Sequence, residues 1–247
     1  MQKEDFHFTI ATARSYFSAK TILKELKLKL PVILFNGAFI TNFETGKHQH
    51  IFDIEKEYLM PLMEIINKAN CHTFISACNN GEDHVYYNET PNAGMQWFLN
   101  DRKKAKDPRL KNSGDLALIF KEKILSINVI DKLEVIEPLS NLIRKTYGDE
   151  LYFHHYINPY DKEFYWLTIN CKVANKGDAI KFYCKQYGYE IENTTVFGDN
   201  LNDIEMVSEA GMGVCPSNAI DEAKAVANKI IDSNEENAIV KYILEHS

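Results

Sequence analysis

Apolar and polar positions along the chain define alternating strand and helix patterns. Near the start, an apolar run at 6–11 is followed by a helical pattern at about 15–28 and a second apolar run at 31–35. A strand, a helix and a strand joined by short links form a parallel unit. Strands and helices alternate again after residue 166. The pattern therefore predicts an α/β fold whose core is a doubly wound parallel sheet.

The middle of the chain has a different pattern. Between about 45 and 165, short strands with alternating polarity are separated by helical stretches, which is typical of an inserted α+β domain. We expect a core domain of residues 1–44 and 166–247, and an inserted domain of residues 45–165. Within the insert, strands are expected at 74–77, 85–87, 124–129 and 152–157, and helices at 54–69, 92–104 and 139–147. The charged stretch 104–113 is expected to be a solvated loop.

Composition excludes several classes of protein. With 45% hydrophobic and 26% charged residues, the 247-residue chain is ordinary for a globular protein. Its net charge of −7 argues against a nucleic-acid or anionic-membrane surface. The five cysteines include no CxxC pair, which indicates free thiols in the cytoplasm. No apolar run is long enough to span a membrane, and the first five residues have no signal-peptide core. No sequence feature bears on the oligomeric state.

Several candidate ligand-binding residues lie in one turn. A buried strand at about 194–197 ends in Gly198, and an apolar helical pattern begins at Ile204. The turn between them presents four polar side chains, Asp199, Asn200, Asn202 and Asp203. In open α/β sheets, ligands bind at this edge, and Mg²⁺ prefers a few carboxylate oxygens together with substrate phosphate. Alternatively, Asn202 or Asp203 only caps the helix, but capping accounts for one polar residue and not four.

A lysine begins another predicted helix. Lys176 follows Asn175 in the first turn, where its charge opposes the helix dipole at a cost of about 0.3–1 kcal/mol. A bound phosphate would compensate for this cost. A solvated lysine whose neighbour Asp178 offsets the dipole is the alternative. His154 and His155 are adjacent on a predicted strand and point to opposite faces, so we do not expect them to share a metal.

These motifs together resemble the haloacid dehalogenase superfamily of phosphohydrolases. They are similar in particular to its Cof-type branch, which carries a large α/β cap of the IIB type between the two halves of its core. The resemblance covers essentially the whole chain and rests on the segments 197–206, 210–214, 175–177, 10–15 and 36–38. The chain departs from the family at Ala13, where glycine is usual.

The resemblance implies roles for individual residues. Thr12 and the amide of Ala13 would hold the phosphoryl group, and Lys176 would neutralise it. Asn202 would contact phosphate, while Arg14 and Asn36 would lie at the substrate-facing rim. Mg²⁺ would be bound by a metal set consisting of Asp199, Asn200 and Asp203.

The attacking carboxylate of the family is missing. The family's nucleophile and its acid–base partner lie in an Asp-x-Asp-Gly-Thr stretch on a strand before the Thr12 motif. The 247 residues contain no Asp-x-Asp sequence. Four buried apolar side chains on such a strand would contribute roughly 6–12 kcal/mol, comparable with the whole stability of a domain at about 5–15 kcal/mol. We therefore expect either a truncated enzyme or a degenerate relative.

Three functions are consistent with these expectations. The leading hypothesis is a Mg²⁺-dependent phosphatase by descent, acting on a small phosphorylated metabolite such as a sugar phosphate, with this chain inactive or nearly so. The second is a non-catalytic module that binds a phosphorylated ligand or Mg²⁺. The third is a phosphosugar mutase or related transferase, which would need the same absent aspartate.

Overall fold

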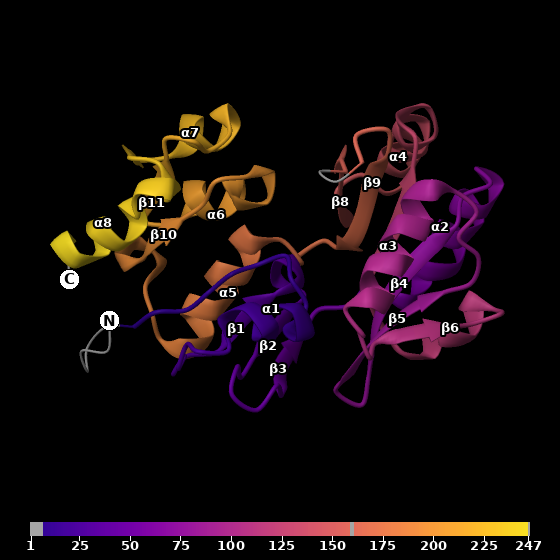
Figure 1. The fold of residues 1–247 in the computed structure, drawn as a ribbon, viewed down its shortest axis with the longest axis horizontal. Helices are drawn as coiled ribbons and strands as arrows, with labels where there is room; N and C mark the ends of the chain where they lie inside the picture. Colours follow the sequence, from indigo (N-terminus) through magenta and orange to yellow (C-terminus); the bar gives the residue numbers. More distant parts are fainter. Residues whose placement is uncertain (1–6, 159–160, 247) are drawn as a thin grey trace. The chain divides into compact units, whose positions relative to one another are not determined.

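A computed structural model describes residues 7–158 and 161–246 (Figure 1). The chain divides into two compact units. The core unit comprises Met1–Ile51 and Val173–Ser247, and the insert unit comprises Phe52–Lys172. No helix in the described ranges is both long and apolar enough to cross a bilayer. All five cysteines are buried free thiols: Cys71, Cys78, Cys171, Cys184 and Cys215.

The boundaries between the units differ from the expected ones, which lie after residues 44 and 165. Strand β3 (His48–Ile51) pairs with β2 (Phe39–Thr41) and so belongs to the core unit. Strand β9 (Tyr165–Cys171) pairs with two strands of the insert. The expectation that the chain has left the insert by residue 166 is therefore wrong, because hydrogen bonding keeps this strand in the insert sheet.

The core unit contains parallel strand pairing in two separate places. Strands β10 (Thr195–Phe197), β11 (Met212–Pro216) and β12 (Lys229–Ile231) form a parallel sheet. Strand β1 (Val32–Leu34) pairs antiparallel with β2 and carries a single parallel bridge between Ile33 and Ala11. The parallel α/β arrangement is confirmed, but the predicted single sheet is present as two fragments.

The helices of the core unit match the predicted order with different ends. Its first helix, expected to reach residue 28, ends at Leu23, because residues 24–27 are exposed and gain no buried contacts to stabilise a further turn. The expected strand at 6–11 is reduced to the bridge at Ala11, and residue 6 lies outside the described range. The helices are α1 (Tyr16–Leu23), α5 (Lys176–Tyr187), α6 (Ile204–Glu209), α7 (Asp221–Val226) and α8 (Ala238–His246), with 3₁₀ turns at Phe35–Gly37, Ile191–Asn193, Leu201–Asp203 and Asn234–Glu236.

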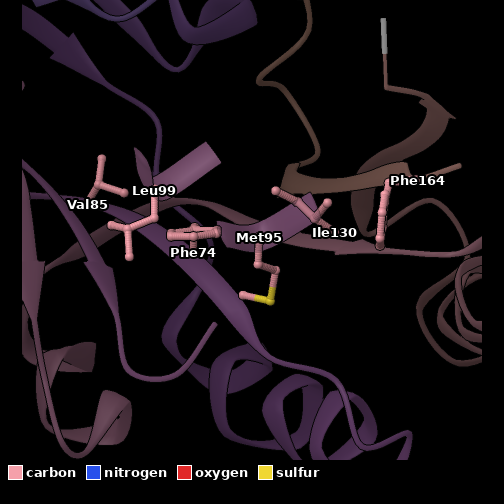
Figure 2. Packing of buried hydrophobic residues seen from close by; sticks show 6 residues of the cluster. All are labelled: Phe74, Val85, Met95, Leu99, Ile130 and Phe164. Carbon is pink, nitrogen blue, oxygen red and sulfur yellow. The ribbon is translucent and has the colours of Figure 1, made fainter. Parts of the chain in front are cut away.

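In the residues that the structure describes, the insert unit is a six-stranded, mostly antiparallel sheet with three α-helices, in the strand order β6-β5-β4-β7-β9-β8. Figure 2 shows part of its core, in which Met95 and Leu99 of α3 belong to one apolar cluster with Phe74, Val85, Ile130 and Phe164. A Cβ at Gly94 would lie 2.6 Å from Phe164 Cγ, so this approach requires glycine. The remaining elements are α2 (Lys56–Lys68), β4 (Thr73–Asn79), β5 (Glu82–Tyr87), α3 (Ala93–Lys104), β6 (Leu110–Asn112), a 3₁₀ turn at Leu116–Lys121, β7 (Lys123–Asp131), α4 (Leu133–Tyr147) and β8 (Leu151–Ile157).

The charged stretch 104–113 is not simply a solvated loop. Arg109 and Asp107 form a buried ion pair, with Nη2 and Oδ2 2.6 Å apart. Leu110–Asn112 then pairs in parallel with β5. The sequence prediction is wrong here because charged residues were assigned to solvent, whereas the two opposite charges neutralise each other inside the unit.

Candidate functional site

The turn after β10 is held together by the side chain of Asp203. Its Oδ2 accepts hydrogen bonds from the backbone N–H groups of Asp199 at 3.0 Å and Asn200 at 3.2 Å. The side chain of Asn200 in turn caps the 3₁₀ turn Leu201–Asp203 and accepts from Leu201 N at 2.8 Å. The reciprocal bonds between Asn200 and Asp203 form a capping box. The alternative that Asn202 or Asp203 only caps the following helix is wrong, because Asp203 makes no side-chain cap hydrogen bond to α6 and the amide of Asn202 bonds Asn36.

Two glycines allow the elements around this turn to approach closely. A Cβ added at Gly198 would lie 2.5 Å from Asp203 Cβ, and one at Gly177 would lie 2.6 Å from Glu205 Cβ. The first glycine lets the turn fold back onto β10, and the second lets α5 pack against α6. Neither position was a candidate from sequence, although both glycines stand within the motifs at 175–177 and 197–206.

Lys176 is a buried residue. It begins α5 directly after Asn175, whose side chain accepts a hydrogen bond from Asp178 N at 2.8 Å and so caps the helix. Lys176 is only 7% exposed, and its Nζ lies 2.5 Å from Asp203 Oδ1. The solvated-lysine alternative is therefore wrong. The cost of a cation at this helix terminus is offset by the buried carboxylate of Asp203.

Both oxygens of Asp203 have partners, so this carboxylate positions its neighbours. One oxygen faces Lys176 and the other receives the two backbone N–H groups. Asp199, in contrast, is exposed beside it. Desolvation by the surrounding protein, followed by the negative charge of Asp203, raises the pKa of Asp199 above its ordinary value. Two carboxylates placed together near one lysine leave excess negative charge, which is the condition under which a divalent cation is favoured.

Thr12 and Asn36 lie on neighbouring turns. Thr12 N donates to Ile33 O at 3.0 Å, and Thr12 O accepts from Asn36 N at 3.0 Å. The hydroxyl of Thr12 accepts from Arg14 N at 3.2 Å, which bends the chain directly after the bridge. Ala13 and Arg14 are exposed on this bend, and the guanidinium of Arg14 bonds Ser18 Oγ at 3.2 Å.

Asn36 connects this turn to the turn after β10. It has a left-handed backbone with φ of 55°, which asparagine tolerates better than most residues. Its Oδ1 accepts a hydrogen bond from Asn202 Nδ2 at 2.8 Å. The core unit thus joins Thr12 to Asn36, Asn36 to Asn202, and the Asn202 turn to Lys176 through Asp203. Each predicted site residue lies in this connected region or, for Ala13 and Arg14, on the adjoining bend.

The adjacent histidines His154 and His155 have separate surroundings. His154 is half-buried, and burial, with His155 beside it, lowers its pKa to about 4. His155 Nδ1 instead lies 3.3 Å from Ser140 Oγ. The two neighbours therefore have different environments, as their alternation along β8 predicts.

The α/β fold is that of the haloacid dehalogenase-like hydrolases. The chain belongs to the haloacid dehalogenase-like hydrolase family, whose model matches residues 1–243. This confirms the resemblance seen in the sequence. A curated relative is the 5-amino-6-(5-phospho-D-ribitylamino)uracil phosphatase YitU of Bacillus subtilis, which is 24% identical over 246 residues, covering 99% of this chain and 86% of YitU.

Solved structures share the same fold. A crystal structure of a protein from Eubacterium rectale superposes with a TM-score of 0.79 at 18% identity, covering 97% of this chain and 85% of that one. The HAD subclass IIB sugar phosphatase BT4131 superposes with a TM-score of 0.69 at 19% identity, covering 96% and 84%. At these identities the likeness concerns the fold alone.

Proposed function

We propose that the core unit is the Mg²⁺ and phosphate site of a phosphohydrolase for small phosphorylated metabolites, and that these 247 residues alone turn over little or no substrate. The observation that carries the proposal is the connected set of contacts from Thr12 through Asn36 and Asn202 to Lys176 and Asp199. Family membership and the curated phosphatase relative support the reaction class.

The residues present fit a magnesium ion and a phosphate. Asp199 offers a carboxylate whose pKa is raised by desolvation and, next, by the negative charge of Asp203. Asn200 and Asp203 would orient this carboxylate through the capping box, with Asp203 completing the metal surroundings through water. A bound Mg²⁺ would supply charge stabilisation for a phosphoryl oxygen. Thr12, the amide of Ala13, Lys176 and Asn202 would hold the phosphate, and Arg14 and Asn36 would contact the rest of the substrate.

The proposed lack of turnover rests on the sequence. An aspartyl nucleophile requires a carboxylate facing the phosphorus, and the chain has no Asp-x-Asp sequence. Asp203 cannot take this role, because both its oxygens are held by Lys176 and by backbone N–H groups. The five buried free thiols support a cytoplasmic location.

Binding and turnover test the proposal separately. In the presence of Mg²⁺, inorganic phosphate should raise Tm, and Asp199→Asn or Lys176→Met should abolish the effect. Lys181→Met is the matched control, because Lys181 lies on the same helix but is exposed. Hydrolysis of p-nitrophenyl phosphate and of sugar phosphates should remain at background. Turnover at ordinary enzyme rates would refute the missing-nucleophile part, and phosphate binding that ignores both substitutions would refute the site.

A non-catalytic binding module is the second candidate. The capping box and the buried Lys176–Asp203 pair form in a chain that has no attacking carboxylate. This favours a protein that still binds a phosphorylated ligand but does not hydrolyse it. Tight, saturable binding of a phosphorylated metabolite without turnover would support this alternative.

A further inference from the structure

A small cavity lies at the carboxyl end of α2, inside the insert unit. It has a volume of about 180 Å³ and is bordered by the last turns of α2, the start of β4 and the residue that follows β5. Because a water molecule occupies about 30 Å³ of liquid, this space can hold a small organic molecule. All of its lining residues belong to the insert unit, whereas the proposed Mg²⁺ and phosphate site belongs to the core unit.

Polar side chains of graded exposure line this cavity. Asn67 and Asn70 are exposed, His72 and Asn88 are partly buried, and Thr73 is only 1% exposed. Asn70 has φ of 55°, a left-handed conformation that asparagine tolerates and that turns the chain between α2 and β4. Three carboxamides thus offer oxygen acceptors to a ligand, with one buried hydroxyl among them.

The hydroxyl of Thr73 is unsatisfied in the free chain. Its Oγ1 is buried and has no hydrogen-bond partner among the residues that the structure describes. Buried polar groups are almost always paired, because an unpaired one costs free energy. Since Thr73 also lines the cavity, a polar group held there can supply the partner that the chain itself does not provide.

The charges around the cavity favour a cation. Its lining contains no Lys, Arg, Asp or Glu among the described residues. The carboxyl end of α2 borders it, and the helix dipole attracts positive charge at this end. Lys68, the last residue of α2, is exposed and is not part of the lining. Desolvation and then the negative charge of Asp131 raise the pKa of Cys71, a lining residue, so the field of Asp131 reaches the cavity.

The remaining lining is apolar. Met63 of α2 and Leu116 of the 3₁₀ turn are both buried. The thiol of Cys71 is also buried, and its Sγ donates to Ala69 O at 3.5 Å. A bare inorganic cation would leave these apolar side chains without a contact, whereas a short aliphatic chain would pack against them. The lining therefore fits a ligand with one cationic end and one apolar end.

We propose that this cavity binds a small organic ammonium ion that carries a short aliphatic chain. The ammonium group donates hydrogen bonds to Thr73 Oγ1 and to carboxamide oxygens of Asn67 and Asn70, and the aliphatic chain packs against Met63 and Leu116. Binding does not depend on the proposed function, because no residue of the core unit lines the cavity.

Three probes of similar size test the proposal on the full chain. Calorimetric titration at neutral pH should show saturable one-to-one binding of n-butylammonium, weaker binding of 1-butanol and no binding of butyrate. Bound n-butylammonium should also slow alkylation of Cys71 more than that of Cys78, which is a buried thiol of the same unit outside the lining. Absence of saturable binding, or butanol or butyrate binding as tightly as the ammonium ion, would overturn the proposal.

Substitutions at Thr73 provide a second readout. Thr73→Val removes the hydroxyl and keeps the shape, so it should leave Tm equal or higher and weaken n-butylammonium binding about two- to tenfold, the effect of one hydrogen bond. Thr73→Ser keeps the hydroxyl and should retain most of the affinity. Unchanged affinity in folded Thr73→Val would contradict the site.

The charge of Asp131 can be tested in the same titration. Asp131→Asn should weaken n-butylammonium binding, and more so at low than at high salt, because salt screens the attraction. Glu137→Gln is the matched control, since Glu137 is an exposed carboxylate of α4 outside the lining. Equal affinities for the two variants would contradict the electrostatic part of the proposal. Mg²⁺-dependent phosphate binding should be the same in all of these variants, which separates this test from a failure of the proposed function.

Discussion

Asn202 donates a hydrogen bond to Asn36 at 2.8 Å, although the two residues are 166 positions apart in the sequence. Asn36 follows β1, and Asn202 lies in the turn after β10, so the contact connects the two strand fragments of the core unit at their carboxyl ends. The relative position of the Thr12 bend and the Asp199 turn depends on this amide pair.

Removing the Asn202 amide should therefore affect both stability and ligand binding. Asn202→Ala is expected to lower the free energy of unfolding by about 0.5–1.5 kcal/mol, the value of one such hydrogen bond. It should also weaken Mg²⁺-dependent binding of inorganic phosphate. Urea denaturation and calorimetry measure the two effects. Asn193→Ala, at an exposed position of the same unit, is the control. Unchanged phosphate affinity would contradict the proposed role of Asn202.

The buried ion pair of Lys176 and Asp203 leads to a prediction about stability. Lys176→Met leaves a buried carboxylate without its cation, which should destabilise the chain by about 3–5 kcal/mol. Adding Asp203→Asn removes the unpaired charge, so the double variant should recover part of the loss. Lys181→Met should change stability by at most about 1 kcal/mol, because its ion pair with Glu209 is exposed. Additive single and double effects in denaturation would contradict the coupling.

Gly198 tests the close approach at the turn. In Gly198→Ala, the new Cβ would lie 2.5 Å from Asp203 Cβ and 2.8 Å from Val207 Cγ2. Overpacking of this kind costs about 1–3 kcal/mol, and it should also displace Asp203 from Lys176. Gly114→Ala meets no atom within 4 Å and serves as the control. Equal melting temperatures for the two variants would show that the turn adjusts freely.

The raised pKa of Asp199 predicts how magnesium binding depends on pH. Protons compete with the ion for this carboxylate, so Mg²⁺ affinity should fall as pH decreases. The fall should begin at a higher pH than for an aspartate with the ordinary pKa of 3.8. Without Mg²⁺, a raised folded-state pKa means that protonation of Asp199 favours the folded chain as pH falls. Calorimetric titrations across acidic pH, repeated with Asp199→Asn, measure the dependence.

His154 predicts a loss of stability in mild acid. Burial lowers its folded-state pKa from 6.5 to about 4, so between these values the unfolded chain binds the additional proton. Its contribution is complete above pH 6.5 and is lost as pH falls toward 4, amounting to at most about 3 kcal/mol. His154→Phe should flatten this part of the stability profile for the insert unit. An unchanged profile would show that other groups dominate it.

Sequence patterns predicted the order of elements in the core unit because each buried strand ends in a recognisable turn. The candidates Asp199, Asn200, Asn202 and Asp203 were selected because four polar residues interrupt an apolar pattern at one place, and the structure shows them in a single turn. The partners of these residues could not be predicted. Lys176 was ambiguous from sequence, since its burial depends on Asp203, which lies 27 positions away. Position within a motif does not reveal which oxygen a lysine contacts.

The incorrect predictions from sequence also have local causes. Tyr165–Cys171 has the apolar pattern of a core strand, and only its pairing with β7 and β8 assigns it to the insert. Arg109 and Asp107 were expected in solvent because charge alone does not reveal an internal ion pair. The 6–11 run has strand character, but in the described residues only Ala11 forms a bridge, to Ile33.

Because all five thiols are buried, their reaction with an alkylating reagent can measure local unfolding of the chain. Cys184 and Cys215 lie in the core unit, while Cys71, Cys78 and Cys171 lie in the insert unit. Burial also raises the pKa of Cys71 to about 11, which suppresses its reactive thiolate. Alkylation followed by mass spectrometry of the digested protein would therefore record, cysteine by cysteine, which unit loosens first under heat or denaturant, without any label being engineered.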